Sequence, residues 1–421
     1  MRITLGRGTL SGQPVQPLRC GDARRLDASS LALLEHVLVI RCCQPDRSTD
    51  LRSRRCPPPS QTNSPPLATL CRAGRPAPVR PLPCAMSNSA HLTPGSRCIA
   101  DWLSWVCSAW PSPRNPGGAG GTVGDLCAVV EEAARALIPG PVAGTALATL
   151  VITDPAMLQD LSTGQASAGF AVEADLRDES GRVSGSAEFV LGGQSSGVLL
   201  LPVGDHIVMV DAGADGVTVE QHEATDFSRP LARVTLNSVP ATRLGVSRSR
   251  YTDLAATVLA AEAAGIARWA LDTAAEYAKV REQFGKPIGS FQAVKHMCAE
   301  MLLRSQQIAV AAADAATAAG DTDDSQLSIA AAVAAGIGIE AARANTKDCI
   351  QVLGGIGITW EHDAHLYLRR ALAIGQFLGG RDHWLRRVTE LTLDGVRREL
   401  HIDLESVADL QPEIAAAVAA V

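Results

Sequence analysis

The sequence predicts an α+β protein, in which a small β-barrel or sandwich over residues 146–245 is followed by an antiparallel four-helix bundle over residues 246–400. Two observations lead to this prediction. Short apolar runs at roughly ten-residue spacing, separated by Gly, Pro and Asp, are typical of short strands joined by turns. Further along, apolar residues recur three and four positions apart over Ala-rich stretches, which is typical of long helices that pack closely.

Residues 1–116 differ in composition from the rest of the chain. They carry fifteen Arg, no Lys and six acidic residues, together with eight of the 11 Cys and sixteen of the 24 Pro. This composition predicts a disordered tail, because it offers little periodic apolar sequence from which to build a core. An alternative hypothesis is out-of-frame translation of GC-rich DNA, which the codons of residues 109–116 would test. No sustained apolar stretch follows Met1, so we expect no signal peptide and a cytoplasmic protein.

The segment from Gly121 to Ile138 predicts an amphipathic helix, which Pro139-Gly140-Pro141 ends. The apolar runs that follow are expected to form the short strands of the β-domain. These expected strands are 148–152, 189–191, 197–201, 206–210, 217–219 and 232–236.

The predicted bundle begins at Arg248 with a helix that runs to Arg281, which makes it ~45 Å long. Ser290 is expected to be the N-cap of a second helix, which ends at Gly320. The remaining helices are expected over 324–353, 365–374 and 382–393, and residues 401–421 form a C-terminal tail.

Several function classes are disfavoured by composition and motifs. The net charge of −6 argues against nucleic acid as a partner. The longest apolar runs fall short of the length that crosses a membrane, so no membrane span is expected. Neither GxGxxG nor GxxxxGK[ST] occurs, which disfavours a Rossmann or P-loop nucleotide site.

Two segments of the predicted bundle resemble the signature of the acyl-CoA dehydrogenase family. Residues 280–292 read VREQFGKPIGSFQ, and residues 351–357 read QVLGGIG, followed by EHDAHLYLRR at 361–370. With the β-rich middle, the resemblance covers about 117–396. It implies an N-terminal helical domain of which only residues 117–145 remain. It also implies FAD as cofactor, dehydrogenation of an acyl-CoA between its α and β carbons, and an electron-transferring flavoprotein as acceptor.

The resemblance also implies which residues contact the flavin dinucleotide. Arg281 offers a planar, charge-assisted fork to the pyrophosphate, and Phe284 offers an apolar face to adenine. Glycines 354 and 355 let the backbone of a neighbouring subunit approach the same pyrophosphate, so the site spans a homo- or hetero-oligomer interface. The complete set of expected flavin contacts is Arg281, Gln283, Phe284, Gln292, Gln351, Gly354 and Gly355.

Each of these residues also has a structural interpretation. Arg281 is then a solvated linker charge, and the Gly-Gly pair a helix C-cap. Glu361, His362 and His365 could suggest a metal site, but their order matches no standard ligand motif, and we expect no metal.

The catalytic base that the family uses is missing from both of its usual places. The reaction needs a carboxylate that removes the α proton, whereas the two equivalent positions hold Gly379 and Ala255. Glu262, two helical turns beyond Ala255, is a weak candidate for a displaced base, and a structural acid is the preferred interpretation.

Other polar residues lie near these positions. Asp253 is a further acid near the empty position on the first helix. Asp382 and His383 are interpreted as part of a capped final helix. The family's Thr-Glu segment that meets the flavin corresponds to Val172-Glu173, which lacks the hydroxyl donor.

Three hypotheses follow for the function. The first is a subunit of a heteromeric acyl-CoA dehydrogenase, in which another acyl-CoA dehydrogenase subunit brings the base. The second is a self-sufficient homo-oligomeric dehydrogenase with an unusual base. The third is a non-catalytic structural subunit or an inactive product of a damaged gene.

Overall fold

A computed structural model of the chain describes residues 2–3, 122–320 and 323–400. Every described residue belongs to one compact unit. The predictions for residues 4–116 and 401–421 lie outside the described residues. The two-residue strand β1 (Arg2–Ile3) pairs in parallel with β12 (Glu399–Leu400).

Three helices precede the β-domain: α4 (Val123–Arg135), α5 (Val142–Val151) and α6 (Pro155–Ser162). Helix α4 confirms the helix expected over 121–138 and begins with a capping box, in which Thr122 and Asp125 exchange side-chain and backbone hydrogen bonds. The strand predicted over 148–152 was wrong, because this apolar run lies in α5. A short run that is buried on all sides carries no periodicity that separates helix from strand.

The β-domain is one sheet with the strand order β7-β8-β4-β2-β5-β6-β9, and β3 pairs with β4. Only β2 and β5 are parallel in this sheet. The other five predicted strands are confirmed. The bounds are β2 (Ala168–Phe170), β3 (Asp175–Glu179), β4 (Arg182–Leu191), β5 (Val198–Val203), β6 (His206–Asp211), β7 (Val217–Gln221), β8 (Leu231–Pro240) and β9 (Thr242–Ser247).

Strand β5 shows how the sheet is buried on both faces. Leu199 and Leu201 point into the core of the β-domain, whereas Val198 and Leu200 belong to the core shared with the helices. Successive side chains of a strand point to opposite faces, so an unbroken apolar run is what a strand between two cores requires.

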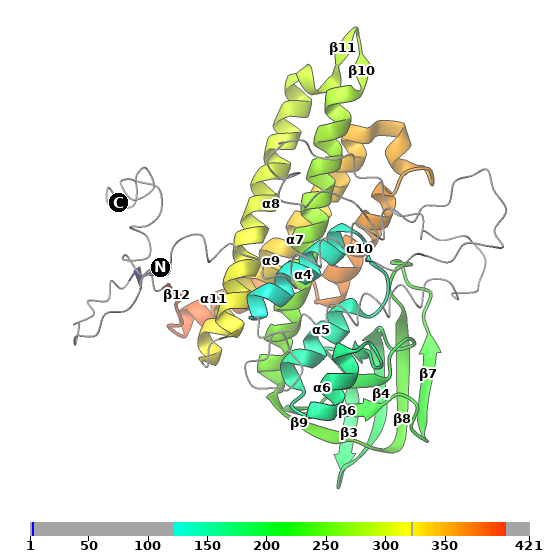
Figure 1. Cartoon of the computed structure of the whole chain (residues 1–421). Coiled ribbons are helices and arrows are strands. Elements are labelled where there is room, and N and C mark those ends of the chain that lie inside the picture. Colours follow the sequence, from blue (N-terminus) through cyan, green and yellow to red (C-terminus); the bar gives the residue numbers. More distant parts are fainter. Residues whose placement is uncertain (1, 4–121, 321–322, 401–421) are drawn as a thin grey trace, which may run out of the picture. The chain divides into compact units, whose positions relative to one another are not determined.

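The helical bundle confirms the predicted order of helices. Its members are α7 (Arg248–Val280), α8 (Gln292–Ala319), α9 (Asp324–Leu353), α10 (Ala364–Phe377) and α11 (Arg381–Leu393). Figure 1 shows α7, α8 and α9 side by side, with the hairpin β10 (Glu282–Gln283) and β11 (Lys286–Pro287) between α7 and α8. The expectation that Ser290 is an N-cap was wrong. Ser290 lies in the 3₁₀ turn η2 (Ile288–Ser290), and α8 begins after Phe291 without a side-chain cap.

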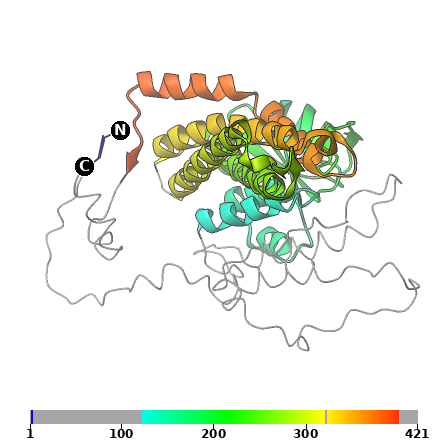
Figure 2. The same cartoon turned by 90° about the horizontal axis from the view of Figure 1, so that it is seen from above.

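Helix α4 packs directly on α7, and the second view shows it beside the bundle (Figure 2). A Cβ on Gly265 of α7 would lie 2.1 Å from the carbonyl oxygen of Glu131. Only glycine permits this backbone approach. Helix α4 is therefore in close contact with the bundle.

Two helical stretches of the described chain, Arg248–Val280 and Asp324–Ile358, are long and apolar enough to cross a membrane. The expectation that the apolar runs fall short of this length was wrong, because the many Ala residues keep the mean hydropathy of both helices high. The most apolar part of the first is 89% buried inside the protein, and that of the second 67%. Such burial is typical of the core helices of a soluble protein.

Candidate functional site

The segment between α7 and α8 forms a two-stranded hairpin that presents Phe284 to solvent. Glu282 pairs with Pro287 and Gln283 with Lys286, which leaves Phe284 and Gly285 as the turn. Both turn residues have positive φ, 54° and 76°, as a type I′ turn requires. The side chain of Phe284 is 91% exposed. A left-handed backbone is unfavourable for a residue with a Cβ, and burial does not compensate it here. An exposed aromatic ring held at such a position indicates a binding role.

The other polar groups of this segment are also exposed. Arg281 follows the last residue of α7 and makes no ion pair within the described part of the chain. The side-chain amide of Gln283 donates to the carbonyl of Glu282 at 2.8 Å. Gln292 Nε2 lies 2.8 Å from His296 Nε2. The segment from Arg281 to Gln292 thus offers an aromatic face, a guanidinium and two amides to a ligand from outside this chain's core.

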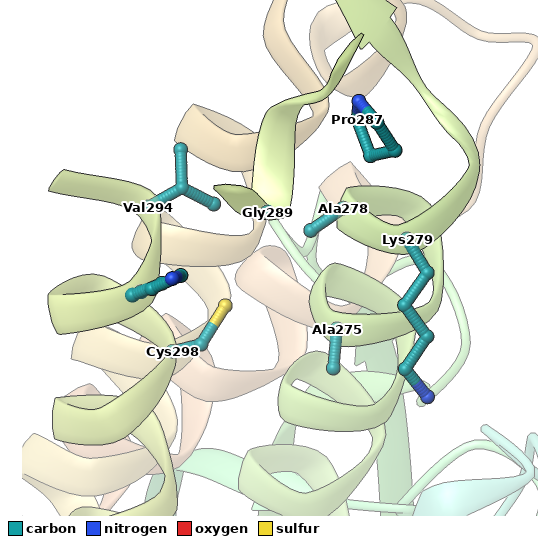
Figure 3. Close-up of a pocket in the computed structure, with 8 residues that line it drawn as sticks. Ala275, Ala278, Lys279, Pro287, Gly289, Val294 and Cys298 are labelled. Carbon is teal, nitrogen blue, oxygen red and sulfur yellow. The ribbon is translucent and has the colours of Figure 1, made fainter. Parts of the chain in front are cut away.

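A shallow groove of about 480 Å³ lies at the base of the hairpin, between the end of α7 and the start of α8 (Figure 3). Its floor is apolar, and Lys279 and Lys295 lie at its sides. The sulfur of Cys298 points into the space between the two helices. Burial, and then the nearby Asp348, raise the pKa of this thiol, so it is not an activated thiolate.

The Gly-Gly pair lies where α9 ends and the 3₁₀ turn η3 (Gly354–Ile358) begins. Gly354 has φ 65° and its N–H bonds to the carbonyls of Gln351 and Ile350, so it is a helix C-cap. Gly355 has no positive φ, and a Cβ built on it or on Gly354 meets nothing within 4 Å. The fold therefore does not require glycine at 355, and the backbone of this turn faces open space. This exposed backbone fits the close approach of a phosphate group from outside.

The two positions at which the resemblance implies a catalytic base hold no ionisable side chain. Ala255 is fully buried on α7. Tyr251, one turn earlier, donates its hydroxyl hydrogen bond to the carbonyls of Ala171 and Leu200 at 3.0 and 3.2 Å. This face of α7 therefore packs on the sheet. Gly379 lies in the turn between α10 and α11 with φ 77°.

Glu262 is held in a buried ion pair. Its carboxylate accepts from Arg229 Nη1 at 2.6 Å, and both side chains are about 2–3% exposed. Arg229 also donates from Nε to Asp226 at 2.7 Å, and Arg370 lies 3.3 Å from the same carboxylate. Burial alone would raise the pKa of Asp226, but Arg370 and Arg229 hold it at about 2. The network favours the structural interpretation of Glu262.

Sequence reasoning missed Asp226 and Arg229, which lie in the long connection between β7 and β8 and have no periodic pattern. The only sequence signal for this buried network was Arg370, which lies in the second motif. Its buried guanidinium reaches Asp226, Ser228 and the carbonyl of Ile138. The network therefore fastens this connection to α7 and α10.

Asp253 points away from the sheet, toward α9 and α11. It accepts from the hydroxyl of Ser328 at 2.6 Å and from Arg387 Nη2 at 2.7 Å. Burial raises its pKa and Arg387 opposes this.

The remaining residues that the sequence singled out lie in two other places. Asp382 and His383 are exposed in the first turn of α11. Val172 and Glu173 follow β2.

The candidate metal ligands have structural partners. His362 Nδ1 accepts from the backbone N–H of Ala364 at 3.1 Å, where α10 begins. The ring of His365 packs edge-on against Trp360, with 4.5 Å between centroids. Burial lowers the pKa of both histidines. Glu361 is exposed.

The comparisons with known proteins agree with the fold and the motifs. A family model described as "Acyl-CoA dehydrogenase, C-terminal domain" matches residues 246–390. FadE34 of Mycobacterium tuberculosis, an acyl-CoA dehydrogenase, is 64% identical over 311 residues, which are 73% of this chain and 44% of FadE34. Acyl-CoA dehydrogenase IpdE2 of Mycolicibacterium smegmatis is 34% identical over 281 residues, 66% of this chain and 81% of IpdE2. The chain thus spans less than half the length of FadE34.

Solved structures show the same fold. A variant of the steroid acyl-CoA dehydrogenase Tcur3481–Tcur3483 has a TM-score of 0.66 and 30% identity, covering 72% of this chain and 91% of that one. The ChsE4–ChsE5 complex of Mycobacterium tuberculosis has a TM-score of 0.61 and 20% identity, covering 72% and 98%. The fold and the sequence relatives define one protein family. The chain belongs to the acyl-CoA dehydrogenase family.

Proposed function

We propose that this chain is the flavin-completing subunit of a heteromeric acyl-CoA dehydrogenase, in which a partner subunit brings the catalytic carboxylate. The observation that carries the proposal is the chemistry of the base positions. Ala255 and Gly379 cannot accept a proton, and the carboxylate of Glu262 is engaged by Arg229 at 2.6 Å. A chain that carries the family's flavin motifs but no base takes part in the reaction when another subunit supplies the catalytic carboxylate.

The exposed residues of the hairpin and of the Gly-Gly turn fit one side of a flavin dinucleotide. Arg281 would pair with the pyrophosphate, Phe284 would stack on adenine, and the open backbone at Gly354 and Gly355 would admit the same phosphates. Gln283, Gln292 and Gln351 would bond ribose or phosphate oxygens. A bound FAD would supply the acceptor for the hydride that leaves the β carbon of the acyl group. These residues leave the other side of the cofactor to a partner.

The lengths of the relatives support a partner of the same kind. FadE34 is roughly twice as long as IpdE2, since 311 residues are 44% of the first and 281 residues are 81% of the second. FadE34 therefore has room for a second stretch of subunit size beside the one that resembles this chain. We infer that the partner of this chain resembles that remaining stretch. The two-component names Tcur3481–Tcur3483 and ChsE4–ChsE5 agree with a paired assembly.

We infer that the substrate of this chain is a steroid-derived acyl-CoA thioester, because the 30% identical structure is a steroid acyl-CoA dehydrogenase. An electron-transferring flavoprotein would reoxidise the cofactor, and the enzyme would work in the cytoplasm. The alternative is a non-catalytic structural subunit or an inactive product of a damaged gene.

Co-expression tests the proposal. The full chain is produced alone and together with the remaining stretch of FadE34 as a separate chain, first shown by circular dichroism and a cooperative thermal transition to be folded. Flavin is measured by absorbance, and activity by dye reduction with steroid-derived and straight-chain acyl-CoA thioesters. We expect about one flavin per pair, and activity, only in the co-purified complex. Stoichiometric flavin and turnover by the chain alone would refute the pairing, and a flavin-free chain in both preparations would favour the non-catalytic alternative.

A further inference from the structure

An exposed aromatic cluster lies beside the Gly-Gly turn. We call it the Trp360 patch, and it consists of Phe227, Ile358, Trp360 and Arg369. Trp360 is 73% exposed, Ile358 75% and Phe227 46%. The rings of Phe227 and Trp360 stack with centroids 6.2 Å apart and planes 19° apart. The Arg369 guanidinium lies 4.5 Å from the Phe227 ring and 5.8 Å from the Trp360 ring.

Neighbouring side chains hold the Trp360 patch in place. Arg369 Nη1 donates to the carbonyl of Thr225 at 3.3 Å, while the next residue, Arg370, is buried against Asp226 and Ser228. Two consecutive arginines therefore hold the connection that carries Phe227. Arg369 bonds to it at the surface, and Arg370 bonds to it in the interior. The edge-on ring of His365 orders Trp360 as well. These contacts reduce the side-chain entropy that the patch would lose on binding.

The composition of the Trp360 patch is that of a binding hot spot. Trp, aromatic residues and Arg dominate the energetic centres of protein interfaces, and large contiguous apolar surface is uncommon on a monomer. The fold gains little from Trp360 or Ile358, because most of each side chain stays in water. The groove at the base of the hairpin is a different surface, lined by α7, α8 and the turn between them.

The Trp360 patch is continuous with the proposed flavin contact. Ile358 is the last residue of η3, the turn that begins at Gly354, and Trp360 follows two residues later. If a partner shares a flavin with Gly354 and Gly355, the surface that adjoins this turn meets the same partner. We propose that the Trp360 patch is the docking surface for the base-carrying subunit of acyl-CoA dehydrogenase fold. This inference rests on the proposed function and adds the residues that hold the partner.

Binding of the remaining stretch of FadE34, verified as folded, tests this inference. Trp360→Ala in the full chain should weaken the complex at least ~30-fold, the effect of a hot-spot residue, and Trp360→Phe should retain most of the affinity. Phe189→Ala is the matched control, since Phe189 is an aromatic residue 57% exposed on β4, and it should change the affinity less than about twofold. The melting temperatures of all three uncomplexed variants should match the wild type, because these side chains are largely exposed.

The outcomes separate the two proposals. If the wild type forms a flavin-containing complex and Trp360→Ala forms it equally well, the docking inference is overturned and the proposed function stands. If Trp360→Ala instead dissociates an oligomer of this chain alone, the surface is a self-contact and the docking inference is overturned. If the wild type binds flavin and turns over without the probe, both proposals are overturned.

Discussion

Replacing Phe284 by Asn should separate flavin binding from stability. Asn is among the residues that adopt a positive φ most readily and is favoured in type I′ turns, so the change relieves backbone strain of about 1 kcal/mol. Phe284 is 91% exposed, and its packing consists mainly of an edge-on contact with Phe291, at 6.0 Å between centroids. Losing that contact costs about 0.5–1 kcal/mol. The free energy of unfolding should therefore change by less than about 0.5 kcal/mol.

The flavin affinity should fall at the same time. Stacking of a base on an aromatic side chain is worth about 1–3 kcal/mol, so the Kd for FAD of the complex should rise about tenfold or more. The assay is a fluorescence titration of the apo-complex with FAD, beside thermal unfolding of the uncomplexed chain. Gly285→Ala is the contrasting variant, because φ 76° strains any residue with a Cβ, and it should lower stability as well as affinity. An unchanged Kd for FAD in Phe284→Asn would refute a role for the ring. A loss of more than about 1 kcal/mol in stability would show that packing sustains the turn.

Three further predictions concern the core. The pKa of Asp226 in the folded protein, about 2, is below its unfolded value, so its ion pairs stabilise the fold at neutral pH. Asp226→Asn should cost about 2 kcal/mol at pH 7, and chemical unfolding should show this difference shrinking as the pH falls from about 4 to 2. Glu262→Gln should lower the unfolding free energy by about 3 kcal/mol, because Arg229 loses a buried counter-charge, yet leave kcat per folded complex unchanged; a large loss of kcat would restore Glu262 as a base. Gly265→Ala should lower the melting temperature far more than Gly245→Ala, where a Cβ meets nothing within 4 Å, and equal effects would contradict the contact between α4 and α7.

Local sequence was sufficient for the long helices and most strands. Residues 248–280 and 324–353 carry apolar positions at helical spacing, and the structure has helices there within one or two residues of the prediction. Five of the six predicted strands are confirmed, because each lies between turn residues. The sixth, 148–152, failed because an apolar run with no polar face has no period to read.

The expected flavin contacts came from the resemblance of residues 280–292 and 351–357 to a family signature, which depends on residue type and order alone. The expectation that Ala255 and Gly379 stand at the base positions came from the same resemblance, and neither side chain accepts a proton in any fold. These expectations need no contact between distant parts of the chain, so the sequence by itself was sufficient to state them.

The ion pair of Glu262 was visible only in the tertiary structure. Its partner Arg229 is 33 positions away in a connection without regular structure, and only the folding of that connection onto α7 and α10 brings the charges to 2.6 Å. The Trp360 patch has the same origin, because Phe227 and Trp360 are more than a hundred positions apart and stack through packing. Periodicity records which face of an element is buried, whereas ion pairs and ring contacts between distant segments depend on the three-dimensional path of the chain.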